Sequence, residues 1–305
     1  MRPGDRNTSW TGAGTGGHHR LMCPAHGSNG ETSAAGRITS VLDAFRDDRE
    51  AMTVSELARR ASLPKTTTHR LTAELIRCGL LERADGELRL GLKLFELGQL
   101  VPQQRSLRDA ARPVMADLRE ATRHSVNLGI LEGSDVVYVD ILAGPDSPRL
   151  PTRVGGRWPA HATAIGKAIL AFSDAAVFLA VLDAGLARVS ERTITSPELL
   201  RQELDRVRES GLAYDSEESR PGLVCVASPV HGPGGQVAGA LSVSGWSARM
   251  KPDRAGPAVR TAGATRSALN VVDQPDTDRA PAATPPGPYT GLATQTRPGR
   301  DSSRS

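Results

Sequence analysis

The segment between residues 53 and 90 constrains the fold most, because it carries a start signal, a break and a turn in a fixed order. Thr53 and Glu56 have the spacing of a capping box, which opens a short helix. Ser62-Leu63-Pro64 interrupts that helix and begins another, since a proline is well tolerated in a first helical turn. Asp85-Gly86 then joins two short strand-like runs as a hairpin turn. This order predicts a winged helix-turn-helix.

The remainder of the chain predicts a second, larger domain. Ile38, Val41, Leu42 and Phe45 first supply one amphipathic helix before the helix-turn-helix. Beyond residue 108, strand-like runs alternate with helical runs. This mixture indicates an α+β domain with an antiparallel sheet and flanking helices. The strand-like runs are 126–131, 136–141, 224–230 and 237–244, and the helical runs are 164–172, 197–208 and 252–269. The predicted organisation is a disordered extension (1–35), the winged helix-turn-helix (36–91), a linker helix (92–107), the second domain (108–272) and a disordered tail (273–305).

The second helix of the helix-turn-helix has the chemistry expected of a DNA-reading element. Such a helix enters the major groove and presents its first residues to base edges. From Arg59 to Arg77 the sequence holds five cations and one anion, which focuses positive charge there, although a merely solvated helix face is the alternative and Thr67 can also face the core. The predicted DNA contacts are Arg59, Lys65, Thr66, Thr67, Thr68, His69 and Arg70, with Arg83 and Arg89 in the hairpin.

Composition narrows the class of protein. Three widely spaced cysteines do not form a disulfide framework and indicate a reducing compartment, so we expect a cytoplasmic protein. The sequence has no stretch of about 18 apolar residues, so we expect no membrane span. Aromatic residues are 3% of the chain, which argues against a stacking platform for single-stranded nucleic acid. No Gly-x-Ser-x-Gly, Walker or dinucleotide fingerprint occurs, so we expect neither an enzyme nor a cofactor.

Several motifs in order resemble one family. Residues 54–71 (VSELARRASLPKTTTHRL) are similar to the helix-turn-helix of the IclR family of bacterial transcription regulators. The resemblance covers about residues 36–270. It departs from the family at Thr68, where an apolar residue is more usual, and in the helix at 252–269, which has few leucines. The later landmarks are Arg89-Leu90-Gly91, Leu97-Gly98, 161–168 (HATAIGKA), 192–195 (RTIT), Glu217-Glu218, 222–227 (GLVCVA) and 241–245 (LSVSG).

The resemblance implies a GAF-like second domain that binds a small organic acid or a related metabolite. We expect a repressor that acts on double-stranded operator DNA as a homodimer or homotetramer, because a monomer reading one half-site rarely binds an operator tightly enough. The residues fit such a pocket: alternate strand residues share a face, which groups Ser242 with Ser244 and Cys225 with Ala227. A helix starting after His161 attracts carboxylates, and Gly166 permits close approach of a ligand or a neighbouring backbone. The predicted effector-binding residues are Gly129, His161, Ala162, Ala164, Gly166, Asp215, Glu218, Cys225, Ala227, Ser242 and Ser244.

Each of these residues also has a structural interpretation, and two other functions stay open. Cys225 can be a small buried hydrophobe and His161 a hydrogen-bonded structural residue. An enzyme would use His161, Cys225 and Asp215 together, but spacing alone does not assemble a triad. A metal sensor would use Cys23 with His26, or zinc between His161 and Cys225, although we expect no metal.

Overall fold

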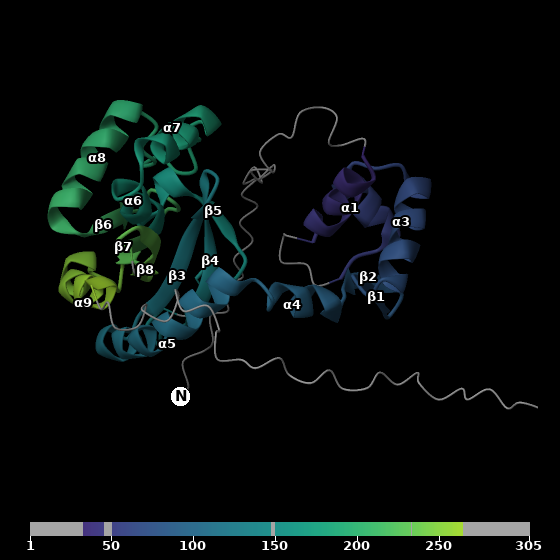
Figure 1. The fold of residues 1–305 in the computed structure, drawn as a ribbon, viewed down its shortest axis with the longest axis horizontal. Coiled ribbons are helices and arrows are strands. Elements are labelled where there is room, and N and C mark those ends of the chain that lie inside the picture. Colours follow the sequence, from purple (N-terminus) through teal and green to yellow (C-terminus); the bar gives the residue numbers. More distant parts are fainter. Residues whose placement is uncertain (1–32, 46–50, 148–149, 233, 265–305) are drawn as a thin grey trace, which may run out of the picture. The chain divides into compact units, whose positions relative to one another are not determined.

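A computed structural model describes residues 33–45, 51–147, 150–232 and 234–264 (Figure 1). The predicted extension up to residue 32 and the predicted tail lie outside these ranges, as do Cys23 and His26 of the hypothetical metal site. Residues 265–269 of the predicted last helix are outside them as well.

The first domain is a winged helix-turn-helix, as predicted. Its helices are α1 (Ala34–Asp43), α2 (Val54–Ala61) and α3 (Lys65–Arg77), and its hairpin is formed by β1 (Leu81–Ala84) and β2 (Glu87–Leu90). α1 begins two residues before the predicted domain start, because Ser33 caps it by accepting a hydrogen bond from the backbone N–H of Gly36. The core of this domain is apolar and includes Val41, Leu57, Leu75, Leu81 and Leu88, each no more than 3% exposed.

Local signals in this domain act largely as the sequence indicates. The Thr53 hydroxyl accepts the Glu56 N–H at 3.2 Å, which is half of the predicted capping box. The Glu56 carboxylate accepts hydrogen bonds from Arg59 and Arg60. In the hairpin, Asp85 and Gly86 both have positive φ angles, of 52° and 82°, and this is the type I′ geometry that matches strand twist.

The predicted linker helix at 92–107 is two helices, α4 (Leu92–Gly98) and α5 (Pro102–Thr122), separated by a turn. α4 follows the wing so closely that a Cβ on Gly91 would lie 2.1 Å from the carbonyl oxygen of Gly79, so the close approach requires glycine. Among the residues that the structure describes, none of those in α4 is buried, and Leu92 and Phe95 are 66% and 63% exposed.

The second domain is a six-stranded antiparallel sheet in the order β5-β4-β3-β8-β7-β6 (Figure 1). Its strands are β3 (Ser125–Glu132), β4 (Asp135–Leu142), β5 (Arg157–Pro159), β6 (Ala213–Ser216), β7 (Leu223–His231) and β8 (Val237–Trp246). The antiparallel α+β architecture is as predicted. Its helices are η1 (Ala160–Ala162), α6 (Ala164–Ala171), α7 (Ala175–Ala184), α8 (Pro197–Ser210) and α9 (Pro252–Ala264).

The helices cover the two faces of the sheet. α5 and α9 pack on the face that carries Val126, Leu128, Val226 and Val243. α6 packs on the opposite face, and α8 packs against α6. Every residue of α6 is buried, which fits its almost wholly apolar sequence AIGKAILA. The short strands β5 and β6 and helix α7 were not predicted, because their segments carry weak periodicity.

Candidate DNA interface and effector site

The exposed face of α3 carries most of the predicted DNA contacts. Lys65, Thr66, His69 and Arg70 are exposed, and their spacing places them on one side of the helix. The opposite side, with Thr68, Thr72 and Leu75, is buried in the domain core. The 13 residues of α3 make a rod roughly 20 Å long, which is suitable for a major groove about 12 Å wide.

Thr68 is a correction to the predicted DNA interface. Its side chain is fully buried, and its hydroxyl donates a hydrogen bond of 3.1 Å to the backbone carbonyl of Pro64. Thr68 therefore occupies the apolar position that the family pattern calls for, with its polar atom satisfied inside its own helix. Thr67 is half-buried at the border between the two faces.

The cations around α3 differ in how they are held. Arg59 is 71% exposed and pairs with Glu56 at 2.6 Å, while the less exposed Arg60 pairs with the same carboxylate at 2.9 Å. Hydrogen bonds from Arg59 and then Arg60 lower the pKa of Glu56 to about 2. In the hairpin, Arg83 is exposed, whereas Arg89 pairs with Glu82 across the strands. Arg83 stands opposite Leu88 and Arg89 opposite Glu82, so the two arginines project from different faces of the wing.

A group of polar side chains lies on the α6 side of the sheet, and we call it the polar strip: Asn127, Asp215, Cys225, Ser242 and Ser244. Strand register brings it together, because Asp215 stands opposite Cys225, Cys225 opposite Ser244, and Ser242 opposite Asn127. Each of these residues is at most 8% exposed. Four were predicted as effector-binding residues from segments far apart in the chain, and the structure makes them neighbours. Ala227, also predicted, pairs with Ser242 on the same face.

The electrostatics of the polar strip favour neutral groups. Burial raises the pKa of Asp215 to about 6, although a hydrogen bond from Ser219 acts in the opposite direction. Burial also raises the pKa of the Cys225 thiol well above its usual value, and the nearby Asp215 adds to the effect. A thiol with a raised pKa is a poor nucleophile. The predicted alternative of a cysteine-dependent enzyme therefore gains no support from this site.

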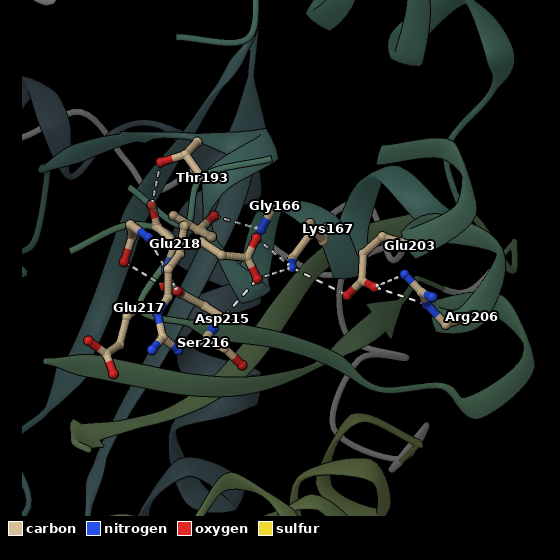
Figure 2. Close-up of polar contacts among 12 residues, drawn as sticks. Gly166, Lys167, Thr193, Glu203, Arg206, Asp215, Ser216, Glu217 and Glu218 are labelled. Carbon is tan, nitrogen blue, oxygen red and sulfur yellow. Dashed lines mark hydrogen bonds and ion pairs between the residues drawn. The ribbon is translucent and has the colours of Figure 1, made fainter. Parts of the chain in front are cut away.

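A buried ion-pair network holds Glu218, another predicted effector residue (Figure 2). The fully buried ammonium of Lys167, on α6, donates to both carboxylate oxygens of Glu218 at 2.7 and 2.8 Å. It also donates to Glu203 on α8 at 3.3 Å, and Glu203 in turn pairs with Arg206 at 2.9 Å. Burial raises the pKa of Glu218, while Lys167 holds it down. Glu218 thus ties α6 to the turn after β6.

The same turn fixes Asp215. One carboxylate oxygen of Asp215 accepts the backbone N–H groups of Glu218, at 2.7 Å, and Ser219, at 3.2 Å, and the other accepts the Ser219 hydroxyl. The Thr193 hydroxyl donates to the Glu218 carbonyl at 2.8 Å, which secures the turn from its other side (Figure 2). The oxygens of Asp215 are therefore engaged by the turn.

The two predicted glycines make room for protein atoms. A Cβ on Gly129 would lie 2.9 Å from a methyl group of Ile165 on α6, and a Cβ on Gly166 would lie 2.1 Å from the Ala160 carbonyl oxygen. Ala162 and Ala164 are buried in the same packing. The start of α6 is also capped by its own chain, because the Thr163 hydroxyl accepts the Gly166 N–H at 3.0 Å. In this structure the space beside these positions is filled by the protein's own atoms.

His161 lies in surroundings that fit the alternative interpretation, a hydrogen-bonded structural residue. Its Nε2 forms a hydrogen bond of 3.0 Å with the carbonyl of Ala187, and burial lowers the pKa of the ring. Over the residues that the structure describes, there is no group of three or more His, Cys, Asp or Glu side chains arranged to hold a metal ion. None of the described helices is both long and apolar enough to cross a membrane.

An open cavity of about 930 Å³ lies among β6, α8 and the start of α9. Its wall includes charges of both signs, among them Arg192, Arg206, Glu203 and Asp253. Of the predicted effector residues, all of which the structure describes, Glu218 alone lines it. The polar strip is enclosed elsewhere, on the face beneath α6.

Sequence reasoning missed Asn127 and Lys167. Asn127 alternates with Ser125 and Gly129 along an otherwise apolar run, so a period of two could have assigned it to the polar face. Lys167 is the one charged residue in the helix AIGKAILA, and a lone cation in an apolar helix indicates a buried partner of opposite charge.

Comparison with known proteins bears on both domains. Residues 34–85 match the profile of the IclR helix-turn-helix domain, and residues 99–269 match that of the bacterial transcriptional regulator IclR C-terminal domain. The chain belongs to the IclR family. The HTH-type transcriptional regulator XynR of Escherichia coli is 33% identical over 217 residues, which are 70% of this chain and 86% of XynR. The acetate operon repressor of Salmonella typhimurium is 30% identical over 230 residues, covering 74% of this chain and 84% of the repressor.

Solved structures of the IclR family share the fold. An IclR homologue from Microbacterium hydrocarbonoxydans, complexed with 4-hydroxybenzoate, aligns with a TM-score of 0.68 and 32% identity, covering 74% of this chain and 94% of the homologue. The IclR protein of Thermotoga maritima aligns with a TM-score of 0.61 and 27% identity, covering 74% and 94% of the two chains. As an IclR-family protein, the chain is a DNA-binding transcription regulator with a C-terminal effector-binding domain, which confirms the function predicted from the sequence.

Proposed function

We propose that this IclR-family regulator is a cytoplasmic repressor that holds α3 in the major groove of its operator. The observation that carries the proposal is the exposed face of α3, where Lys65, Thr66, His69 and Arg70 stand together while the opposite face is buried in the core. The acetate operon repressor, a relative at 30% identity, supports repression as the mode of action.

DNA binding tests this part directly. Arg70→Ala is expected to weaken binding to a fragment from the regulator's own promoter region by about 1–3 kcal/mol and to leave binding to random duplex nearly unchanged, if Arg70 reads a base edge. Arg77→Ala is the matched control, because Arg77 is exposed on the same helix but roughly 10 Å further along its axis and pairs with Glu74. Fluorescence anisotropy at fixed salt gives both affinities. Equal affinity of the wild-type protein for promoter and random duplex would refute the proposal.

The second part of the proposal is that a small carboxylate binds at the polar strip and alters operator affinity. Ser242 and Ser244 are the proposed donors to the carboxylate, from adjacent positions on one face of β8. The 4-hydroxybenzoate complex of the relative from Microbacterium hydrocarbonoxydans supports an organic acid as the ligand class. Because the polar strip is enclosed, binding requires α6 to move from the sheet, and an effector shifts the regulator through its different affinity for the two arrangements.

Thermal shift with 4-hydroxybenzoate, lactate and propionate tests the site. Ser244→Ala is expected to abolish or reduce the stabilisation that any binding acid gives. Ser228→Ala is the matched control, because Ser228 is equally buried but its hydroxyl lies toward Gly263 on α9, on the other face of the sheet. Equal losses in the two variants would show that the effect is structural and not local to the polar strip.

We also propose that the regulator is a homodimer joined through α4. Leu92 and Phe95, one turn apart on one side of α4, are 66% and 63% exposed on a helix that buries no residue among those the structure describes, and an exposed apolar pair of this kind indicates an interface. The expected occupant is a second copy, because a protein with one recognition helix per chain reads the two half-sites of an operator as a symmetric pair.

Light scattering after size exclusion tests the interface. Leu92→Glu is expected to yield monomers and to weaken operator binding. Leu199→Glu on α8 replaces a similarly exposed leucine, at 55%, and is expected to leave the mass unchanged. A dimer or tetramer that persists in Leu92→Glu would place the interface elsewhere.

A further inference from the structure

Asn127 presents an unusual hydrogen-bonding state at the centre of the polar strip. Its side chain is fully buried, and its Nδ2 donates to the hydroxyl oxygens of Ser242, at 3.1 Å, and Ser244, at 2.8 Å. Its Oδ1 is buried and, among the residues that the structure describes, has no hydrogen-bond partner. Buried carbonyl groups are nearly always paired, because an unpaired one forfeits its hydration without replacement.

The amide of Asn127 sets the direction of the hydroxyl groups. An amide NH2 can donate but cannot accept, so each serine oxygen that it contacts acts as the acceptor. A hydroxyl has one proton and two lone pairs, and each serine therefore keeps its proton for another partner. Ser244 lies against the Cys225 sulfur, a weak acceptor that a ligand oxygen displaces. The polar strip thus offers two O–H donors beside one unfilled C=O acceptor.

The ligand that fits these groups both accepts and donates hydrogen bonds. A carboxylate has acceptors only, so it matches the two serine hydroxyls but leaves Asn127 Oδ1 unsatisfied. A ligand that fills every group must also donate one hydrogen bond. Asp215 does not compete with Asn127 Oδ1 as the acceptor of that bond, because its oxygens already accept from the turn at Glu218 and Ser219. Among donors a hydroxyl fits better than an ammonium, since a neutral amide oxygen cannot offset the burial of a positive charge.

We infer that the effector is a hydroxycarboxylic acid, with its carboxylate on Ser242 and Ser244 and its hydroxyl donating to Asn127 Oδ1. Asn127 is then the residue that distinguishes a hydroxy acid from the corresponding plain acid. The inference rests on the proposed function, because it assigns the ligand class of the same site.

Isothermal titration of the full-length protein with acids that differ by one hydroxyl tests the inference. The probes are lactate against propionate and 4-hydroxybenzoate against benzoate, with alanine as the ammonium analogue of lactate. Wild-type protein is expected to bind the hydroxy acid of at least one pair roughly tenfold or more tightly than its partner, the factor that one good buried hydrogen bond supplies. Asn127→Ala is expected to bring that ratio close to one while the plain acid still binds.

Two further variants sharpen the test. Asn127→Asp is isosteric but presents an acceptor to both serines, so they turn their protons toward residue 127, and both acids are expected to bind at least tenfold more weakly. If Asn127→Ala unfolds too easily to titrate, Asn127→Leu replaces it, because leucine is closer to asparagine in volume. The same ratio of affinities for hydroxy acid and plain acid is then measured. Ser228→Ala is expected to keep the wild-type ratio.

The outcomes separate this inference from the proposal beneath it. Acids that bind with equal affinity within each pair, or a hydroxyl preference that survives in Asn127→Ala, would overturn the inference and leave the carboxylate site standing. Tighter binding of alanine than of lactate would overturn the choice of a hydroxyl. Failure of every acid to bind, with Ser244→Ala no different from wild type, would remove the proposed site and the inference together.

Discussion

Replacing Lys167 by methionine removes a fully buried charge from the second domain. Methionine has a similar length and no charge, so Lys167→Met keeps the volume while removing three hydrogen bonds of the ammonium. Glu203 retains Arg206 at 2.9 Å, and it is 18% exposed. Glu218 loses both of its bonds to the ammonium, and its side chain is 10% exposed. The cost therefore falls mainly on Glu218.

The expected magnitude follows from leaving one buried charge without its partner. Breaking a buried ion pair in this way costs about 3–5 kcal/mol, more than the pair itself contributes relative to apolar residues. Glu218→Gln in the Lys167→Met background removes the orphaned charge and is expected to recover more than half of that loss. Lys251→Met, at an exposed position, is the control and is expected to cost less than about 0.5 kcal/mol.

The destabilisation has a predictable pH dependence. Burial already raises the pKa of Glu218, and loss of Lys167 removes the main influence that holds it down, so the folded-state pKa rises further above the unfolded one. A carboxyl with a raised folded pKa favours the folded state below the unfolded pKa, and this contribution is lost as pH increases through the folded pKa. Lys167→Met is therefore expected to lose less stability at pH 5 than at pH 8.

Urea unfolding followed by tryptophan fluorescence measures these differences, because Trp158 and Trp246 pack against the core of this domain. A loss of about 3 kcal/mol moves the midpoint by roughly 1.5 M at an m value of about 2 kcal/mol/M. A loss below about 1 kcal/mol, or a double variant no more stable than Lys167→Met, would refute the argument that Glu218 depends on Lys167.

Three other predictions address single positions. Asp215 has a pKa raised from 3.8 to about 6, so wild-type stability should fall as pH rises between these values. Asp215→Asn should remove that pH dependence in urea titrations and raise the free energy of unfolding at pH 8 by about 1–3 kcal/mol. An unchanged pH dependence would contradict the raised pKa of Asp215. Thr68→Val should leave operator affinity within about twofold, because the hydroxyl bonds to Pro64; a tenfold loss in anisotropy would return Thr68 to the DNA interface. Gly166→Ala should lower stability by about 1–3 kcal/mol or more, because its Cβ meets the Ala160 carbonyl, and an unchanged melting temperature would show that η1 and α6 separate readily.

The sequence by itself determined the elements whose signals are local. Thr53 as a cap, Asp85-Gly86 as a two-residue turn and the apolar spacing of α1 act through neighbours within about four residues, so their order along the chain was enough to predict a winged helix-turn-helix. Alternation likewise predicted the long strands β3, β4, β7 and β8. It also assigned Ser242 and Ser244 to one face before any register was known.

Tertiary structure alone decided what those side chains meet. Thr68 looks like its polar neighbours in sequence, and the helix phase set by the buried Leu75 turns it into the core. Asn127 reaches Ser242 across 115 residues, and Lys167 joins carboxylates from two other elements, because sheet register and helix packing bring distant segments together. Gly129 and Gly166, which the sequence predicts as effector contacts, lie close to Ile165 and Ala160 because of how α6 packs on the sheet. Sequence patterns fix which way a residue faces within its own element, whereas the identity of a partner depends on long-range packing that no local pattern encodes.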